Sequence, residues 1–163
     1  RSQMKNQGKA FEQDFIKSVP DTVFHYRFRD GTAGFSGTKN ENVRFQAQNI
    51  CDFLLFDGRL ILLELKSHKG KSIPFSCIRE NQLAELSKAD NYSGIIPGLI
   101  FNFRDINKTY FVHIRHAYYY YYHADRKSYP LDWVQQYGVE IKAELKRTRY
   151  RYYVKEFLQE IGA

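Results

Sequence analysis

The order of the predicted elements places this chain in the α/β class, with a central mixed β-sheet flanked by helices. Helical and strand patterns follow one another in the order helix, strands, helix, hairpin and helices. Two apolar runs on either side of Asp57-Gly58 predict a buried β-hairpin near the middle of the chain. Strands that alternate with helices in this way pack as a sheet with helices on its faces.

The first two elements are a helix over 5–18 and a strand over 22–29. Phe11 and Phe15 recur at helical spacing and form an apolar stripe, with Glu12 at its edge. In 22–29, aromatic residues alternate with basic ones, so we expect a half-exposed strand with a basic outer face. The next residues, 30–42, carry three glycines and predict a mobile loop long enough to suggest a function.

The middle of the chain predicts the sheet itself. Strands are expected at about 50–56 and 59–66, followed by a basic polar loop. A helix over 79–90 would turn Leu83 and its neighbours inward, and 98–115 would form a second hairpin.

The last part of the chain is aromatic and basic. Five consecutive tyrosines end at Tyr122; we expect the inward ones to pack in the core and the outward ones to lie at an interface. A short helix is expected at 131–138. The tail over 141–161 shows helical spacing and is expected to be helical.

Length and composition indicate one domain with an anionic partner. The 163 residues suit a single domain, with a core of about 5–125 and a C-terminal helical tail of about 131–163. The net charge of +7 and the 13 Tyr and 13 Phe residues favour nucleic acid as that partner.

Other features exclude several classes of function. The two cysteines, Cys51 and Cys77, make no disulfide framework, which is typical of a reducing cytoplasm. We expect neither a signal peptide nor a membrane span, because no apolar run approaches the roughly 20 residues that a span needs. A phosphate-binding glycine loop and a Ser-His-Asp arrangement are also missing from the sequence pattern.

Three charged side chains interrupt the central apolar runs and are the strongest functional signal. Asp52 lies near the start of the first run, and Glu64 and Lys66 lie near the end of the second. Charged groups are almost never fully buried unless they are paired or bind a metal. These residues therefore predict a site, with a structural ion pair as the alternative.

The length of the turn decides whether the two carboxylates can share a metal ion. With a two-residue turn, Asp52 and Glu64 would point to opposite faces of the sheet. With a three-residue loop over 56–58, Leu55 pairs with Arg59 and the carboxylates become diagonal neighbours on one face. We therefore predict the three-residue loop, or a bulge near Asp52.

A pair of carboxylates in this place suits Mg²⁺, with Mn²⁺ as a substitute, because both ions take hard oxygen ligands. Asp52 and Glu64 are the expected ligands, and the backbone carbonyl of Leu65 is expected to add another. Lys66 leaves the same strand face as Glu64, where it can stabilise a pentavalent phosphate or position the attacking water. These parts suit hydrolysis of a phosphodiester.

The spacing Asp-x(11)-Glu-x-Lys across a hairpin resembles the PD-(D/E)xK nuclease superfamily, with Cys51 in place of the usual proline. Further segments resemble Holliday junction resolvases of RecU type, over roughly residues 5–125. These segments are Gly8-Lys9-Ala10-Phe11-Glu12, Ile73-Pro74-Phe75, Asn81-Gln82-Leu83, Gly98-Leu99-Ile100-Phe101 and Tyr110-Phe111-Val112.

The resemblance implies a restriction-endonuclease-like core and a metal-dependent endonuclease that acts as a homodimer on four-way DNA junctions. By this resemblance, Asp52 and Glu64 bind Mg²⁺ and Lys66 acts on the scissile phosphate. It also implies that Glu12 helps to orient the metal or its water and that Gln82 assists at the site.

Basic residues elsewhere are candidates for contact with DNA phosphates. In the loop after the second strand and in the tail, these candidates are His68, Lys69, Lys71, Lys146, Arg147, Arg149 and Arg151. A solvated basic loop and a charged helix face are the alternatives.

The sequence thus predicts a Mg²⁺-dependent endonuclease that resolves Holliday junctions in DNA recombination and repair. Two alternatives stay open. Another PD-(D/E)xK nuclease, of restriction or repair type, would not prefer junctions to linear duplex. A junction-binding protein without catalysis would have no need for Asp52, Glu64 and Lys66 together.

Overall fold

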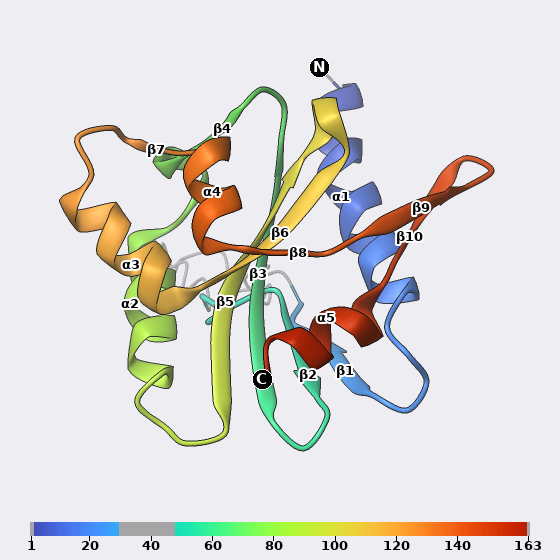
Figure 1. Cartoon of the computed structure of the whole chain (residues 1–163), viewed down its shortest axis with the longest axis horizontal. Coiled ribbons are helices and arrows are strands. Elements are labelled where there is room, and N and C mark those ends of the chain that lie inside the picture. The colour runs from blue at the N-terminus through green and yellow to red at the C-terminus, as the bar shows by residue number, and fades with distance from the viewer. Residues whose placement is uncertain (1, 30–47, 163) are drawn as a thin grey trace, which may run out of the picture.

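The computed structural model describes residues 2–29 and 48–162 and builds them around a six-stranded mixed sheet (Figure 1). In spatial order the strands are β1 (Phe24–Arg27), β2 (Phe53–Phe56), β3 (Leu60–His68), β5 (Ile95–Phe103), β6 (Lys108–His113) and β8 (Val139–Glu140). β3 and β5 run parallel, whereas the other neighbouring strands run antiparallel. The predicted α/β class with a central mixed sheet is confirmed.

Helices cover both faces of this sheet (Figure 1). One face packs against α2 (Glu80–Ala89), α3 (Ile114–His123) and α4 (Leu131–Tyr137). The other packs against α1 (Ser2–Lys17) and α5 (Val154–Glu160). Two strand pairs lie outside the sheet, β4 (Ser72–Pro74) with β7 (Ser128–Pro130), and β9 (Ala143–Lys146) with β10 (Arg149–Tyr152).

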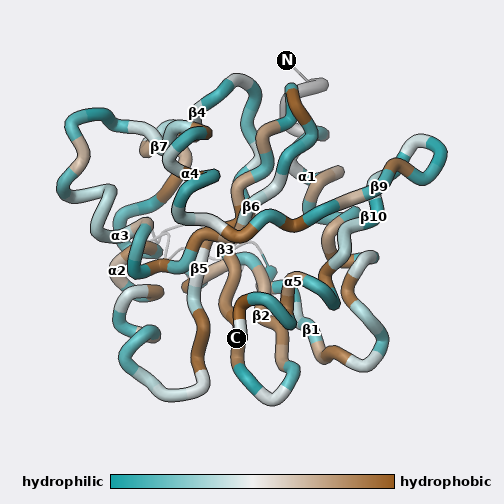
Figure 2. The backbone as a smooth tube through the Cα atoms, in the orientation of Figure 1, coloured by the Kyte–Doolittle hydropathy of each residue, from teal (hydrophilic) through white to brown (hydrophobic). Residues whose placement is uncertain are grey.

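The core follows from the alternation of side chains along β3. Ile61, Leu63 and Leu65 pack with the side chains of α1 and α5, whereas Leu62 packs with those of α2. β3 and β5 lie in the middle of the sheet and are buried on both faces, which explains their continuous apolar character (Figure 2). Within the described residues, no helix combines the length and apolar character that crossing a bilayer requires.

Most of the predicted elements are present. The helices expected at 5–18, 79–90 and 131–138 correspond to α1, α2 and α4, and both hairpins form. The tyrosine run belongs to α3, where Tyr119 and Tyr122 are exposed and the tyrosines between them pack against the core. The loop predicted over 30–42 lies outside the described residues.

Two expectations were wrong. The alternation in 22–29 predicted one buried face, but every residue of β1 is exposed, including Phe24 at 62%. β1 lies at the edge of the described sheet, so little packs on it. In the tail, a helix forms only at α5, because tyrosines at 150 and 152 alternate with arginines and Arg147 takes a left-handed turn conformation (φ 57°).

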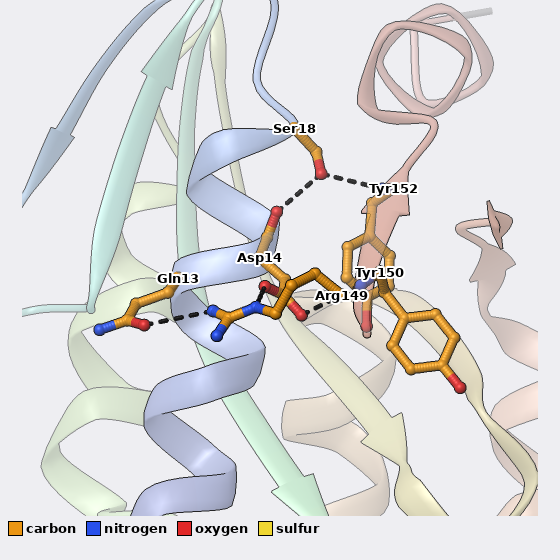
Figure 3. Close-up of polar contacts among 6 residues, drawn as sticks. All are labelled: Gln13, Asp14, Ser18, Arg149, Tyr150 and Tyr152. Carbon is orange, nitrogen blue, oxygen red and sulfur yellow. Dashed lines mark hydrogen bonds and ion pairs between the residues drawn. The ribbon is translucent and has the colours of Figure 1, made fainter. Parts of the chain in front are cut away.

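The β9–β10 hairpin is fixed to α1 by a buried aspartate that the sequence reasoning missed (Figure 3). Asp14 accepts hydrogen bonds from the Arg149 guanidinium (Nε to Oδ1, 2.7 Å) and from the Tyr150 N–H (3.3 Å). The hydroxyl of Ser18 accepts the Tyr152 N–H at 2.8 Å and donates to the Asp14 carbonyl at 2.7 Å. The position of Asp14 beside Phe15 on the apolar stripe could have revealed this role, because a carboxylate there needs a partner.

We expect Asp14→Ala to lower the free energy of unfolding by about 2 kcal/mol, because it leaves an arginine and a buried N–H without their acceptor. Urea unfolding followed by circular dichroism measures this change. The control is Asp21→Ala, which removes an exposed carboxylate just beyond α1. Equal stabilities of the two variants would contradict the structural role of Asp14.

Candidate active site

The turn between β2 and β3 sets the register that brings two carboxylates together. The strands pair Phe56 with Leu60, so the loop has three residues, 57–59. The predicted loop length is confirmed, but the loop is one residue further along than predicted, and Leu55 pairs with Ile61 instead of Arg59.

The cause of this shift is the side chain of Asp57. Its carboxylate accepts the backbone N–H of Arg59 (3.1 Å) and the guanidinium of the same residue (2.6 Å), which closes the turn around Arg59. Gly58 takes a positive φ of 103° at the centre of this turn. The ladder with β3 ends at Phe53 with Leu63, one residue before Asp52 is reached. The Asp52 carboxylate lies close enough to that of Glu64 for each to affect the pKa of the other.

Asp52 lies where the β2–β3 ladder ends. The last ladder pair is Phe53 with Leu63, and from there to His68 no strand among the described residues pairs with β3 on that side. The backbone of Asp52 is still paired: its N–H donates to the Leu63 carbonyl (3.1 Å). Its carboxylate accepts the N–H of Leu65 at 2.8 Å. The divergence of the strands therefore opens an edge of β3 beside the Asp52 carboxylate.

Glu64 is the buried centre of the site. Its side chain is 3% exposed and its two oxygens have different partners. Oε1 contacts the ammonium of Lys66 at 3.0 Å, and Oε2 accepts a hydrogen bond from the amide of Gln82 in α2 at 3.3 Å. Because Lys66 lies two residues after Glu64, both side chains leave the strand on the face that α2 covers.

Burial makes this carboxylate pair hard to ionise completely. Burial, and then the charge of Asp52, raises the pKa of Glu64 to about 7, although Lys66 acts in the opposite direction. Burial also raises the pKa of Asp52, against the effect of the Leu65 N–H. A cation between the two carboxylates would stabilise the state in which both are ionised.

The donor set fits Mg²⁺. Its oxygen ligands would come from Asp52 and Glu64, and Mg²⁺ commonly uses one or two carboxylates and keeps several waters. The carbonyl of Leu65 points to the same strand edge as its N–H, which contacts Asp52, so it lies on the correct side to join them. Within residues 2–29 and 48–162, no group of three or more Asp, Glu, His or Cys side chains lies close enough together to hold a metal ion. The described residues therefore offer no third side-chain ligand of these types beside Asp52 and Glu64.

Cys51 precedes this site but takes no part in its chemistry. Its thiol is buried and donates to the Phe53 carbonyl at 3.2 Å. Burial, with Glu64 adding to the effect, raises the pKa of this thiol to about 12, so the reactive thiolate is scarce at neutral pH.

Glu12 lies on α1, which packs on the opposite face of the sheet from Glu64 and Lys66. Its carboxylate forms an ion pair with Arg27 of β1 at 3.2 Å. The positive charge of Arg27 in turn lowers the pKa of Asp52. The structure thus links Glu12 to the site through Arg27, and a direct role for Glu12 stays a prediction.

Gln82 is placed at the site, as predicted. It is buried on α2, its amide also reaches the Asn49 carbonyl at 3.4 Å, and its own side-chain oxygen has no partner among the described residues. Gln82 therefore fixes one oxygen of Glu64 while keeping a free acceptor inside the site.

The predicted DNA-binding residues lie in two separate places. His68 ends β3, and Lys69 and Lys71 are exposed in the loop that follows. Lys146, Arg147 and Arg151 are exposed on the β9–β10 hairpin, which projects beyond α1 (Figure 1), and Lys146 pairs with Glu144. Arg149 is held by Asp14. Contact with DNA stays a prediction for all of these residues.

Comparisons with known proteins identify the family of this chain. A family model described as RecU, recombination protein U, matches residues 32–155. The chain is also 36% identical, over 96% of its own length and 87% of the relative's, to the SPbeta prophage-derived uncharacterized protein YotM of Bacillus subtilis (strain 168).

We expect Glu64→Gln to stabilise the metal-free protein, with a gain that grows as the pH rises from 5 to 8. The pKa of Glu64 is about 7 in the folded state, against a normal value of 4.5. Between these values the folded state alone holds the proton, so its stability falls as the pH rises through this range. Urea unfolding in EDTA at several pH values measures the difference between variant and wild type.

Glu85→Gln on the exposed side of α2 is the matched control and should show no such trend. Mg²⁺ should stabilise the wild type at pH 8 and narrow its difference from Glu64→Gln, because binding to the folded state alone adds to its stability. A difference that is independent of both pH and Mg²⁺ would contradict the strained carboxylate pair.

Proposed function

The chain belongs to the RecU (recombination protein U) family, and on this premise we propose that it is a Mg²⁺-dependent endonuclease that resolves four-way DNA junctions. The observation that carries this proposal is the close pair of carboxylates formed by the buried Glu64 and the partly buried Asp52, with Lys66 beside them. An ion pair built only for stability would need one carboxylate for the lysine, whereas this site holds two at a raised pKa.

In this proposal, Asp52, Glu64 and the Leu65 carbonyl hold Mg²⁺, and Mn²⁺ can replace it. The ion, when bound, neutralises charge on the phosphate and makes a bound water more acidic. Asp52 keeps its place because its backbone is paired and its carboxylate accepts the Leu65 N–H. The protein thus supplies a rigid set of oxygen atoms at the open edge of β3.

Lys66 and Gln82 act on the two sides of Glu64. Lys66 now contacts Glu64, and its side chain is 24% exposed, so its ammonium can turn to an oxygen of the scissile phosphate once Glu64 is engaged elsewhere. There it would stabilise the charge that develops in the transition state. Gln82 is a positioning residue, because its amide holds Glu64 from the side of α2.

Junction resolution needs two cuts in symmetry-related strands, and each chain has one such site in its described part. We therefore propose a homodimer that places two sites on one junction. The net charge of +7 supports binding to the DNA backbone, which supplies affinity without base recognition.

We expect wild type with Mg²⁺ to make paired, symmetric nicks in a labelled four-way junction and to leave matched linear duplex largely intact. Asp52→Asn should reduce the cleavage rate at least about 100-fold while junction binding persists, because the ion loses one carboxylate. EDTA should abolish cleavage, and Mn²⁺ should restore it. Denaturing gels of the products, with binding measured by fluorescence anisotropy, give both quantities.

Glu85→Gln on the exposed side of α2 is the control and should cleave like wild type. Equal cleavage of junction and linear duplex would support a nuclease activity but contradict a specific role in junction resolution. Tight junction binding by wild type without cleavage would contradict the enzyme and favour a binding protein.

A further inference from the structure

A pocket of about 420 Å³ lies between α1, the turn after β5 and the β9–β10 hairpin. It is not part of the carboxylate site. Ser67 in its lining directly follows Lys66 in β3 but points to the opposite face of the sheet. The residues of its lining that matter here are Ser67, Arg104, Asn107, Thr148 and Arg149.

Arg104 brings an uncompensated positive charge to this pocket. Its Nε is buried and has no hydrogen-bond partner among the described residues. None of the ion pairs within 2–29 and 48–162 includes Arg104. Arg104 as a whole is half-buried. Its guanidinium stays charged at neutral pH, and a buried N–H without an acceptor is costly. The pocket therefore favours an anion.

Two carboxylates, one in the pocket lining and one beside Arg104 in the chain, have hydrogen-bond partners of their own. Asp14 in the lining accepts both the Arg149 guanidinium and the Tyr150 N–H (Figure 3). Asp105, beside Arg104 in the chain, accepts the N–H of Gly70 at 2.7 Å. The rest of the lining is uncharged apart from Arg149, and it includes the polar side chains of Asn107 and Thr148.

The charge of the hairpin above the pocket points to a polyanion. Residues 143–152 carry four basic side chains and one acidic one. A phosphate in the pocket would thus contact Arg104 and also lie in the positive electrostatic potential of the hairpin. Arginine suits this role because its guanidinium binds phosphate oxygens in a fixed geometry.

We propose that this pocket binds a backbone phosphate of the DNA substrate, with Arg104 as its main counter-charge. The proposal rests on the proposed function and adds a second point of contact to it. This phosphate is not the scissile one, because the pocket opens on the face of the sheet opposite the carboxylates. It would hold an arm of the DNA against α1 and the hairpin while the site acts elsewhere on the same substrate.

The test is the salt dependence of junction binding by the full chain in EDTA, measured by fluorescence anisotropy. Arg104→Gln should weaken binding about tenfold at 0.1 M salt and lower the slope of log K against log salt by about 1. The matched control is Arg115→Gln, which removes the same charge from an exposed position on α3. The control should leave the slope unchanged.

A second pair of variants keeps Arg104 in place, in case Arg104→Gln does not fold. Asn107→Asp adds a negative charge to the pocket at an exposed position whose left-handed conformation (φ 49°) aspartate tolerates. Asn91→Asp adds the same charge before β5, at the other end of that nine-residue strand. Asn107→Asp should weaken junction binding severalfold and Asn91→Asp should not.

Suppose that wild type binds and cleaves junctions, but Arg104→Gln and Asn107→Asp bind as their controls do. That result would contradict phosphate binding in the pocket and would support the proposed nuclease function. A wild type that neither binds nor cleaves junctions would instead contradict the proposed function itself. The two failures are therefore distinguishable in one set of measurements.

Discussion

The carboxylate of the partly buried Asp52 lies close to that of the buried Glu64, and the rest of the site is arranged around their repulsion. A buried charge is tolerated only with compensation. Here the compensation comes from the Leu65 N–H for Asp52, and from Lys66 and Gln82 for Glu64. Even so, the pKa of Glu64 stays near 7. The pair is held by the fold in a state that a divalent cation would relieve, which is the usual condition of a preorganised metal site.

That arrangement depends on the number of residues in one turn. Because side chains alternate along a strand, a loop of 57–59 places both carboxylates on the face of α2, and a loop one residue shorter would separate them. Asp-Gly and the apolar runs predicted the hairpin, and the parity of its register was predicted from the requirement that both carboxylates share one face. The sequence could not predict the pairing itself, because the closure of the turn by Asp57 and Arg59 depends on side-chain geometry.

The rest of the comparison between sequence and structure follows the same logic. Periodic apolar stripes identified α1 and α2, whereas Gln82 was a candidate only through the family resemblance of its segment. The tail was misread because Lys146 and the arginines after it suit a helix face, whereas the alternation of Tyr150 and Tyr152 with arginine defines a strand. The structural role of Asp14 depends on residues more than a hundred positions away, which local patterns do not reveal. The helix α1 thus contacts both the edge strand β1, through Glu12, and the β9–β10 hairpin, through Asp14.

The most direct test of the central claim is to locate a bound metal. A crystal of the protein soaked in Mn²⁺ should show an anomalous peak between the carboxylates of Asp52 and Glu64, within coordination distance of both, with the Lys66 ammonium moved away from Glu64. The same soak of Asp52→Asn should show no peak there. A wild-type crystal with Mn²⁺ bound only elsewhere, and with Lys66 still paired to Glu64, would contradict the account.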